Sequence, residues 1–299
     1  MAAIEVHNLS KCYGKVKALD GVSFSVERGE LFGLIGPDGA GKTTLFRLLT
    51  TLLNADEGSA AVDGLDVARD YLAIRSRVGY MPGRFSLYPD LSVEENLNFF
   101  AALFGVTVEE SCDLIAPIYK QIEPFCKRRA GKLSGGMKQK LALSCALIHR
   151  PSVLFLDEPT TGVDAVSRSE FWDMLSGLKE REITILVSTP YMDEASRCDR
   201  IALCNEGRIL GIDTPEGLVR GFDRRLYGIR AKNMFALLER ARTATDIVDC
   251  YPFGERHHMV VDDGFDVERF KTQLGDVEGL EIVSVEPTIE DMFIKLIKR

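Results

Sequence analysis

Short apolar runs alternate with amphipathic stretches along residues 1–221 of the chain. Several of these runs are apolar at every position rather than at every second one, which is typical of central strands covered on both faces. Alternation of such runs with helical stretches predicts an α/β domain. The predicted strands include residues 29–35, 78–81, 153–156, 183–187, 201–204 and 208–211.

The spacing of apolar residues changes to three and four between residues 87 and 147, as Leu97, Phe100, Ala101 and Phe104 illustrate. This spacing places apolar residues on one face of a helix, so the stretch is predicted to be a helical subdomain inserted in the sheet domain. A boundary near residue 221 separates residues 1–221 from a small α+β domain, residues 222–299. Its predicted strands are residues 225–231, 259–261 and 281–285, and its predicted helices are residues 233–242, 266–274 and 288–296.

The composition is that of a globular protein that binds no nucleic acid. Hydrophobic residues make up 45% of the chain, which excludes a disordered class, and the net charge of −8 opposes contact with a phosphate backbone. No run reaches the ~18 apolar residues of a membrane-spanning helix, and no signal-peptide pattern is visible. The seven cysteines contain no C-x-x-C pair, so we expect reduced, mostly buried thiols in a cytosolic protein.

A glycine-rich segment follows the predicted strand that ends at Ile35 and precedes a predicted helix at residues 44–53. It matches the pattern G-x-x-x-x-G-K-[ST], in which glycines let backbone N–H groups surround phosphates at a helix N-terminus. Lys42 is expected to reach the β- and γ-phosphates, and the Thr43 hydroxyl to ligate Mg²⁺. The predicted nucleotide-binding residues here are Gly36, Pro37, Asp38, Gly39, Ala40, Gly41, Lys42, Thr43 and Thr44.

Two carboxylates, Asp157 and Glu158, follow the predicted strand at residues 153–156. An aspartate at the end of a strand beside a phosphate loop suits Mg²⁺ held through water, which makes Asp157 the second predicted metal residue. Glu158 is the candidate catalytic residue, because it could polarise an attacking water as a general base. Acidic residues often end strands, so this motif alone is only moderately specific. Together with the phosphate loop it indicates a nucleotide site much more strongly.

A third motif at residues 133–140 places Ser134, Gly135 and Gly136 at the start of a predicted helix, which suits a second anion. With these three motifs, residues 4 to about 220 resemble the ATP-binding cassette (ABC) family. The resemblance implies a P-loop NTPase core with an antiparallel β subdomain and an inserted helical subdomain, and ATP and Mg²⁺ as cofactors. It also implies that two cassettes meet head to tail, with the Ser134–Gly136 signature of each covering the ATP held by the other.

Other segments extend the resemblance. Tyr13 stands where the family stacks an aromatic ring on adenine, although a core tyrosine is the alternative interpretation. Residues 161–164 are similar to the loop that crosses the dimer interface, and residues 85–97 to the region that receives the coupling helices of membrane subunits. Residues 286–294 resemble the ending of exporter-type cassettes of bacterial drug and lipid export systems.

Two positions depart from the family pattern. Gly83 stands where the family has a glutamine that contacts Mg²⁺ and the attacking water, and Pro190 stands where a histidine holds the γ-phosphate. Glycine lacks a side chain, and proline offers neither a side-chain donor nor an N–H group. Each positioned polar group contributes roughly 10²-fold or more to such a reaction, so the chain's own site is predicted to hydrolyse ATP slowly unless another residue supplies these contacts.

These features predict the ATP-binding subunit of an ABC transporter, an ATP hydrolase that couples ATP binding and hydrolysis to export through separate membrane permease subunits. The intact signature beside a degenerate site favours a heterodimer with a second, complete cassette, with a homodimer as the alternative. The expected location is cytoplasmic, peripheral at the inner face of the cell membrane. The alternative function is a soluble or regulatory ABC ATPase that is not coupled to transport.

Overall fold

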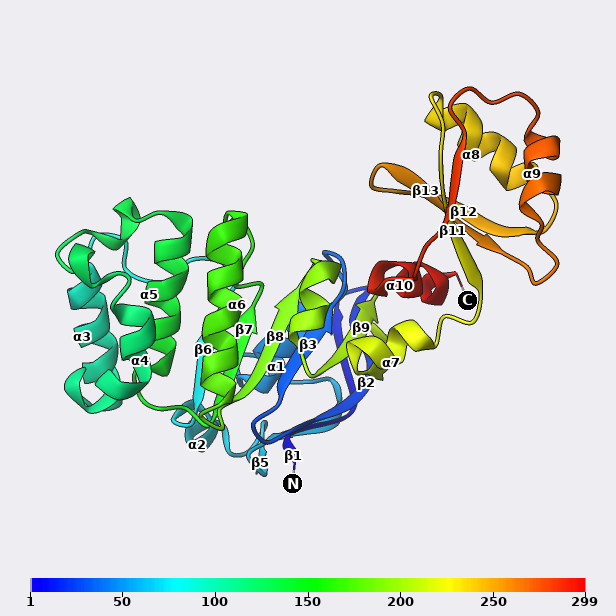
Figure 1. Ribbon diagram of the computed structural model, residues 1–299. Helices are drawn as coiled ribbons and strands as arrows, with labels where there is room; N and C mark the ends of the chain where they lie inside the picture. The colour runs from blue at the N-terminus through cyan, green and yellow to red at the C-terminus, as the bar shows by residue number, and fades with distance from the viewer. Residues whose placement is uncertain (1, 299) are drawn as a thin grey trace. The chain divides into compact units, whose positions relative to one another are not determined.

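The computed structural model describes residues 2–298, and the chain forms two compact units (Figure 1). The first unit is Met1–Pro215 and the second is Glu216–Arg299, so the division falls before residue 221, the boundary expected from the sequence. The helix α7 (Pro215–Arg220) leads into Gly221, whose carbonyl accepts a hydrogen bond of 3.1 Å from Lys295 Nζ of the second unit.

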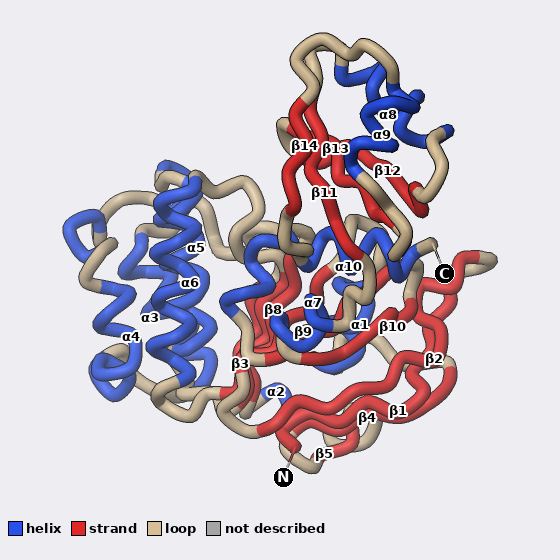
Figure 2. Tube along the Cα trace, turned by 45° about the vertical axis from the view of Figure 1, so that its right-hand side comes forward, coloured by secondary structure: helices blue, strands red, loops and turns tan. Residues whose placement is uncertain are grey.

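An antiparallel sheet is formed by four strands from the first 66 residues. Its strand order is β2-β1-β4-β5, with bounds β1 (Ala2–Tyr13), β2 (Val16–Glu27), β4 (Glu57–Val62) and β5 (Leu65–Asp66). Val22, Phe24 and Val26 of β2 are buried and occupy alternate positions, as expected for a sheet with one face on the core. Figure 2 shows these strands running together along one side of the first unit.

A six-stranded sheet forms the centre of the first unit, in the order β10-β9-β3-β8-β7-β6. The strands pair in parallel except β10, which is antiparallel to β9. Every residue of β3, β7 and β8 is buried, which confirms the prediction of strands covered on both faces. The bounds are β3 (Leu31–Ile35), β6 (Val78–Met81), β7 (Val153–Asp157), β8 (Thr184–Thr189), β9 (Arg200–Asn205) and β10 (Arg208–Asp213).

The helix α1 (Lys42–Leu49) packs between the two sheets. Its Phe46 contacts Phe155 of β7 edge to face at 6.0 Å between ring centroids, and the same core cluster includes Ile4 and Phe24 of the antiparallel sheet. This burial fixes the start of α1 directly after β3, so the phosphate-loop segment lies between a buried strand and a buried helix. Ile74 of α2 (Tyr71–Arg75) belongs to the same core cluster, whereas α6 (Ala165–Lys179) packs against β3, β8 and α5.

The predicted helical subdomain is confirmed between β6 and β7 (Figure 1). It contains α3 (Val93–Phe104), α4 (Cys112–Tyr119) and α5 (Gly135–Leu147). Helix α3 begins with a capping box, in which Ser92 and Glu95 each accept a hydrogen bond from the backbone of the other. Short 3₁₀ helices at Glu109–Ser111, Glu123–Phe125, Ala130–Lys132 and Met192–Arg197 complete the first unit.

The second unit is a four-stranded antiparallel sheet in the order β12-β13-β11-β14. Its chain order is β-α-β-β-α-β, which is the split βαβ arrangement, and α8 and α9 lie on one side of the sheet (Figure 2). A final helix, α10, reaches the other side, because its Asp291 accepts hydrogen bonds from Tyr251 and His258. The bounds are β11 (Arg225–Arg230), α8 (Met234–Thr243), β12 (Ile247–Phe253), β13 (Arg256–Val261), α9 (Val267–Leu274), β14 (Glu281–Ser284) and α10 (Ile289–Ile297).

Candidate nucleotide-binding site

The glycine-rich loop takes a backbone conformation that only glycine adopts readily. Gly39 and Gly41 have φ angles of 82° and 95°, in the left-handed region. A Cβ atom on Gly41 would lie 2.4 Å from the carbonyl oxygen of Ala18, and one on Gly36 would lie 2.2 Å from that of Cys204. The backbone of the loop is therefore packed directly against neighbouring backbone, which leaves its other side free for a ligand.

Lys42 is the first residue of α1, and its side chain folds back over the loop. The side chain is buried, and Nζ donates hydrogen bonds to the carbonyls of Gly36 (2.8 Å) and Pro37 (3.0 Å). The same Nζ lies 3.1 Å from Oε1 of Glu158. The structure thus brings together the two side chains that the sequence assigned to phosphate binding and to general-base catalysis.

Asp157 and Glu158 lie at the carboxyl end of β7, and the neighbouring strand β8 positions both. Ser188 Oγ donates a hydrogen bond of 2.8 Å to Asp157 Oδ1 and accepts one of 3.0 Å from the backbone N–H of Glu158. Glu158 also has a φ angle of 50°, an unusual value for a non-glycine residue. Ser188 belongs to no sequence motif, because it is a serine inside a buried strand.

These residues surround a pocket of about 530 Å³. Of the predicted nucleotide-binding residues, Tyr13 and residues 38–44 line it, whereas Gly36 and Pro37 do not. The predicted catalytic residue Glu158 also lines it, and the predicted metal residue Asp157 does not. Tyr13 is 45% exposed, so it is not a core residue, and its ring is available to a ligand. The lining also includes Val16, Lys17, Ala18 and Glu206, none of which the sequence pattern indicated.

The turn between β9 and β10 explains how Glu206 reaches the pocket. Gly207 donates a backbone hydrogen bond of 3.1 Å to Ala40 of the loop and accepts one of 2.9 Å from Asp20. The turn therefore joins the phosphate loop to β2. This contact links residues almost 170 positions apart in the chain, so no local sequence pattern indicates it.

The residues proposed to hold Mg²⁺ fit that role in part. Thr43 lines the pocket, and Asp157 is buried with Oδ1 already bound to Ser188, which leaves Oδ2 for water or metal. Within residues 2–298 no cluster of three or more histidine, cysteine or carboxylate side chains could hold a metal alone.

The chain is similar to known proteins of one family. A family model described as ABC transporter matches residues 19–161. The chain is also 35% identical to the Nod factor export ATP-binding protein I of Burkholderia orbicola (strain AU 1054), over 100% of this chain and 98% of that protein. The chain belongs to the family of ABC transporter ATP-binding proteins.

Other relatives of this ABC cassette match part of its length. The probable multidrug ABC transporter ATP-binding protein YbhF of Escherichia coli (strain K12) is 42% identical over 72% of this chain, but the match spans only 38% of that relative. Among solved structures, the ATP-binding subunit of an ABC transporter has a TM-score of 0.67 and 30% identity, covering 74% of this chain and 93% of that one. A dimeric post-hydrolysis state of the cassette MJ0796 bound to ADP and Pi has a TM-score of 0.64 and 25% identity, covering 71% and 98%.

The ABC signature lies outside the pocket. Ser134 caps the N-terminus of α5 through a hydrogen bond of 3.4 Å from Met137 N–H to its Oγ, and Ser134 and Gly135 are exposed. A Cβ atom on Gly136 would lie 2.6 Å from Ser167 Oγ of α6, so this glycine permits close packing of two helices. The signature therefore presents an open helix N-terminus that this chain's own pocket does not use.

The two positions that depart from the ABC pattern, Gly83 and Pro190, follow the ends of β6 and β8. A Cβ atom on Gly83 would lie 2.9 Å from the carbonyl oxygen of Asp157, closer than real Cβ contacts allow without a shift. Pro190 directly follows Thr189, whose carbonyl accepts a hydrogen bond of 3.3 Å from Gly36 N–H. Neither residue lines the pocket.

Proposed function

We propose that this ABC cassette binds Mg·ATP in the pocket around Lys42 and Glu158 and acts as the ATP-binding subunit of an export system. The observation that carries this proposal is that three features meet at one pocket: a phosphate loop with glycines in the left-handed conformation, a buried lysine and a carboxylate. The loop N–H groups and Lys42 would bind the phosphates, and the Tyr13 ring would stack on adenine. Mg²⁺ held by Thr43, and through water by Asp157, would neutralise phosphate charge.

The reaction that these residues support is slow hydrolysis in this chain's own pocket. Glu158 can accept a proton from an attacking water, but Gly83 has no side chain to hold that water and Pro190 has no donor for the γ-phosphate. Because the signature is complete and exposed, we propose that it closes over ATP bound by a second cassette. That pairing makes a heterodimer the proposed assembly, with the complete site on the partner.

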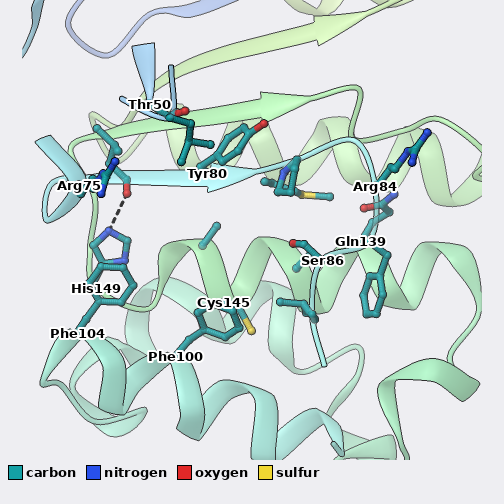
Figure 3. Close-up of a pocket in the computed structure, with 18 residues that line it drawn as sticks. Thr50, Arg75, Tyr80, Arg84, Ser86, Phe100, Phe104, Gln139, Cys145 and His149 are labelled. Atoms are coloured by element: carbon teal, nitrogen blue, oxygen red, sulfur yellow. Dashed lines mark hydrogen bonds between the residues drawn. The ribbon is translucent and has the colours of Figure 1, made fainter. Parts of the chain in front are cut away.

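A groove between the sheet and the helical subdomain supports the proposal of a membrane partner. This subdomain groove has a volume of about 320 Å³ and a mainly apolar wall that includes Leu52, Val78, Met81, Leu87, Phe100 and Phe104 (Figure 3). Exposed apolar side chains nearby, Tyr88, Phe99 and Leu103, extend the same surface along α3 and the segment before it. We propose that a cytosolic segment of a membrane permease subunit occupies the subdomain groove.

Direct measurement of nucleotide binding and turnover tests this function. The purified chain should bind a fluorescent ATP analogue in the presence of Mg²⁺ and hydrolyse ATP slowly by itself. Addition of a second cassette that carries the glutamine and histidine should raise hydrolysis, and Ser134→Arg in this chain should abolish the increase. A chain that binds no ATP would refute the proposal, and a rate that no partner raises would favour a regulatory ABC protein.

The length and apolar character of the helices bear on how the protein relates to a membrane. Across residues 2–298 none of the helices combines the length and the apolar character that crossing a bilayer requires. We propose that Mg·ATP-driven closure of paired cassettes is the step that moves separate membrane subunits.

A further inference from the structure

One buried carboxylate near the end of β8, that of Glu194, does not line the nucleotide pocket. It belongs to the 3₁₀ helix Met192–Arg197 and is only 3% exposed. The Thr160 hydroxyl donates to its Oε1 (2.9 Å) and Oε2 (3.2 Å), and the Thr189 hydroxyl donates to Oε2. Nε of Arg168 lies 3.6 Å from Oε1. Burial of a carboxylate is costly unless donors and a cation compensate it, and here they come from three separate segments of the chain.

The first segment that Glu194 holds contains Pro190. Thr189 Oγ1 accepts a hydrogen bond of 3.0 Å from the N–H of Tyr191, so the proton of this hydroxyl is directed to Glu194. The two residues on either side of Pro190 are thereby bonded to each other. The guanidinium of Arg168 also lies over the Tyr191 ring, 4.9 Å from its centroid. All of these contacts join protein groups, so the fold itself fixes the backbone around Pro190.

The second segment that Glu194 holds, residues 160–164, packs against the signature. It begins at Thr160, whose hydroxyl is bonded to Glu194. A Cβ atom on Gly135 would lie 3.4 Å from the carbonyl oxygen of Gly162, which brings the backbone of the signature within contact range of this segment. The segment leads directly into α6, and α6 lies beside α5, the helix that the signature begins (Figure 1 and Figure 2). The surroundings of the signature are therefore built from elements that Glu194 joins.

We propose that Glu194 is a positioning residue that fixes the signature of this chain independently of the nucleotide in its own pocket. Glu194 ties the backbone around Pro190, residues 160–164 and the first turn of α6 into one unit, and Ser134–Gly136 packs against that unit. The signature then meets a second cassette in one position, whether this chain's own pocket is empty or filled. The role rests on the proposed function, since it takes a second cassette as the partner of the signature. Glu194 acts only through the segments that it holds.

Hydrogen exchange of the purified full chain tests the clamp without catalysis. Peptides that cover residues 160–168 should exchange equally fast with and without Mg·ATP in the wild type, and about tenfold faster or more in Glu194→Ala, which loses all three contacts. Asp173→Asn is the matched control, because its exposed ion pair with Arg197 joins the same two helices but contributes little. Thr160→Val keeps the shape and removes one hydroxyl, so it gives a smaller increase and replaces Glu194→Ala if thermal unfolding shows that variant to be misfolded. Wild-type protection that requires ATP, or variants that exchange like the wild type, would overturn the clamp.

Turnover with a second cassette tests the consequence for the signature. With a partner that carries the glutamine and histidine, Glu194→Ala should lower the stimulated kcat about tenfold, because a displaced signature no longer fits the partner's ATP. ATP affinity of this chain alone should stay within about threefold of the wild type, whereas a merely structural loss lowers both. If the wild type shows no stimulation, the proposed function fails, and exchange in the isolated chain still decides whether the clamp exists. Full stimulation in Glu194→Ala would refute the positioning role while the function stands.

Discussion

The ammonium group of Lys42 lies 3.1 Å from a carboxylate oxygen of Glu158. Lys42 is buried and Glu158 is largely buried, so the two charges neutralise one another in a place where water screens them little. A nucleotide phosphate that approaches Lys42 must therefore compete with Glu158 for the cation. In the proposed site, binding of ATP would free the carboxylate from Lys42 and make it available to a water molecule only when the phosphates are in place.

Replacement of Glu158 by glutamine should separate binding from hydrolysis. The amide cannot take a proton from water, so we expect the hydrolysis rate to fall by about 10²- to 10⁴-fold. ATP affinity should hold or rise, because the phosphates no longer compete with a carboxylate for Lys42. Turnover assays and equilibrium binding of a fluorescent ATP analogue measure both effects. Glu206→Gln, which changes another carboxylate in the same pocket, is the control and should leave turnover within about threefold of the wild type; equal losses in both variants would contradict the assignment.

Replacement of Lys42 by alanine should weaken ATP binding itself, and not only turnover. The substitution removes the cation for the phosphates and leaves Glu158 as an unpaired negative charge in the pocket, so we expect ATP affinity to fall about 100-fold or more. Lys17→Ala is the matched control, since Lys17 also lines the pocket but forms an ion pair with Asp20. Equilibrium titration with the ATP analogue gives both affinities. Similar affinities for Lys42→Ala and the wild type would show that the loop does not bind phosphate.

Sequence patterns predicted the parts of the fold that depend on local chemistry. The apolar runs located β3, β6, β7, β8, β9 and β10. The phosphate-loop pattern located Lys42, and the carboxylates at the end of an apolar strand located Glu158, whose side chain meets Lys42 in the pocket. The strand β12 was missed, because Asp249 and Pro252 interrupt its apolar pattern. The strand lies at an edge of its sheet, where proline is tolerated.

Contacts between distant segments were beyond the reach of the sequence patterns. Ser188 positions Asp157 and Glu158 from the neighbouring strand, and Gly207 fixes Ala40 from the β9–β10 turn. Each contact depends on which strands become neighbours in the sheet, and no residue involved has a distinctive local pattern. The close approach of Gly83 to Asp157 likewise follows from the pairing of β6 with β7.

The introduction of a histidine at position 190 should increase hydrolysis in this chain's own pocket. Pro190 follows Thr189, whose carbonyl accepts a hydrogen bond from Gly36, the first residue of the phosphate loop. The side chain of a histidine at position 190 would therefore start from backbone beside that loop. A donor to the γ-phosphate is expected to raise the turnover rate of Pro190→His by about tenfold or more. The comparison is made with the purified chain alone, and Pro190→Gln controls for the loss of the proline ring. An unchanged rate in Pro190→His would show that another residue already supplies the contact.

A side chain at position 83 should destabilise the protein as well as alter the site. The backbone places a Cβ of residue 83 at 2.9 Å from the carbonyl oxygen of Asp157, so Gly83→Ala forces the loop or the end of β7 to move. We expect the free energy of unfolding to fall by about 1–2 kcal/mol, measured by denaturant titration. The control is Gly177→Ala, because a Cβ at that helical glycine meets no neighbouring atom. A stability of Gly83→Ala equal to that of the wild type would indicate a loop that shifts freely, and Gly83→Gln would then be a direct test of the missing glutamine.

Asp291 should make the stability of the second unit depend on pH. Its Oδ1 accepts hydrogen bonds from Tyr251 Oη (2.7 Å) and His258 Nδ1 (2.6 Å), and Oδ2 accepts from the N–H (2.8 Å) and Oγ1 (2.7 Å) of Thr288. Burial by itself would raise the pKa of Asp291, but these donors outweigh it and hold the pKa below 3.8, the ordinary value. The ionised carboxylate joins α10 to β12 and β13.

A carboxyl group with a depressed pKa stabilises the fold above its unfolded pKa, and this stability is lost as the pH falls through the folded value. The second unit should therefore lose stability below about pH 3.8, as measured by hydrogen exchange of the full chain resolved to peptides of β12 and β13. Asp291→Asn should lower the free energy of unfolding by about 2–4 kcal/mol at pH 7 and remove this part of the acid sensitivity, because an amide group cannot accept all four hydrogen bonds. Asp263→Asn, at an exposed position in the same unit, should do neither. Acid sensitivity that persists unchanged in Asp291→Asn would assign it to other carboxylates.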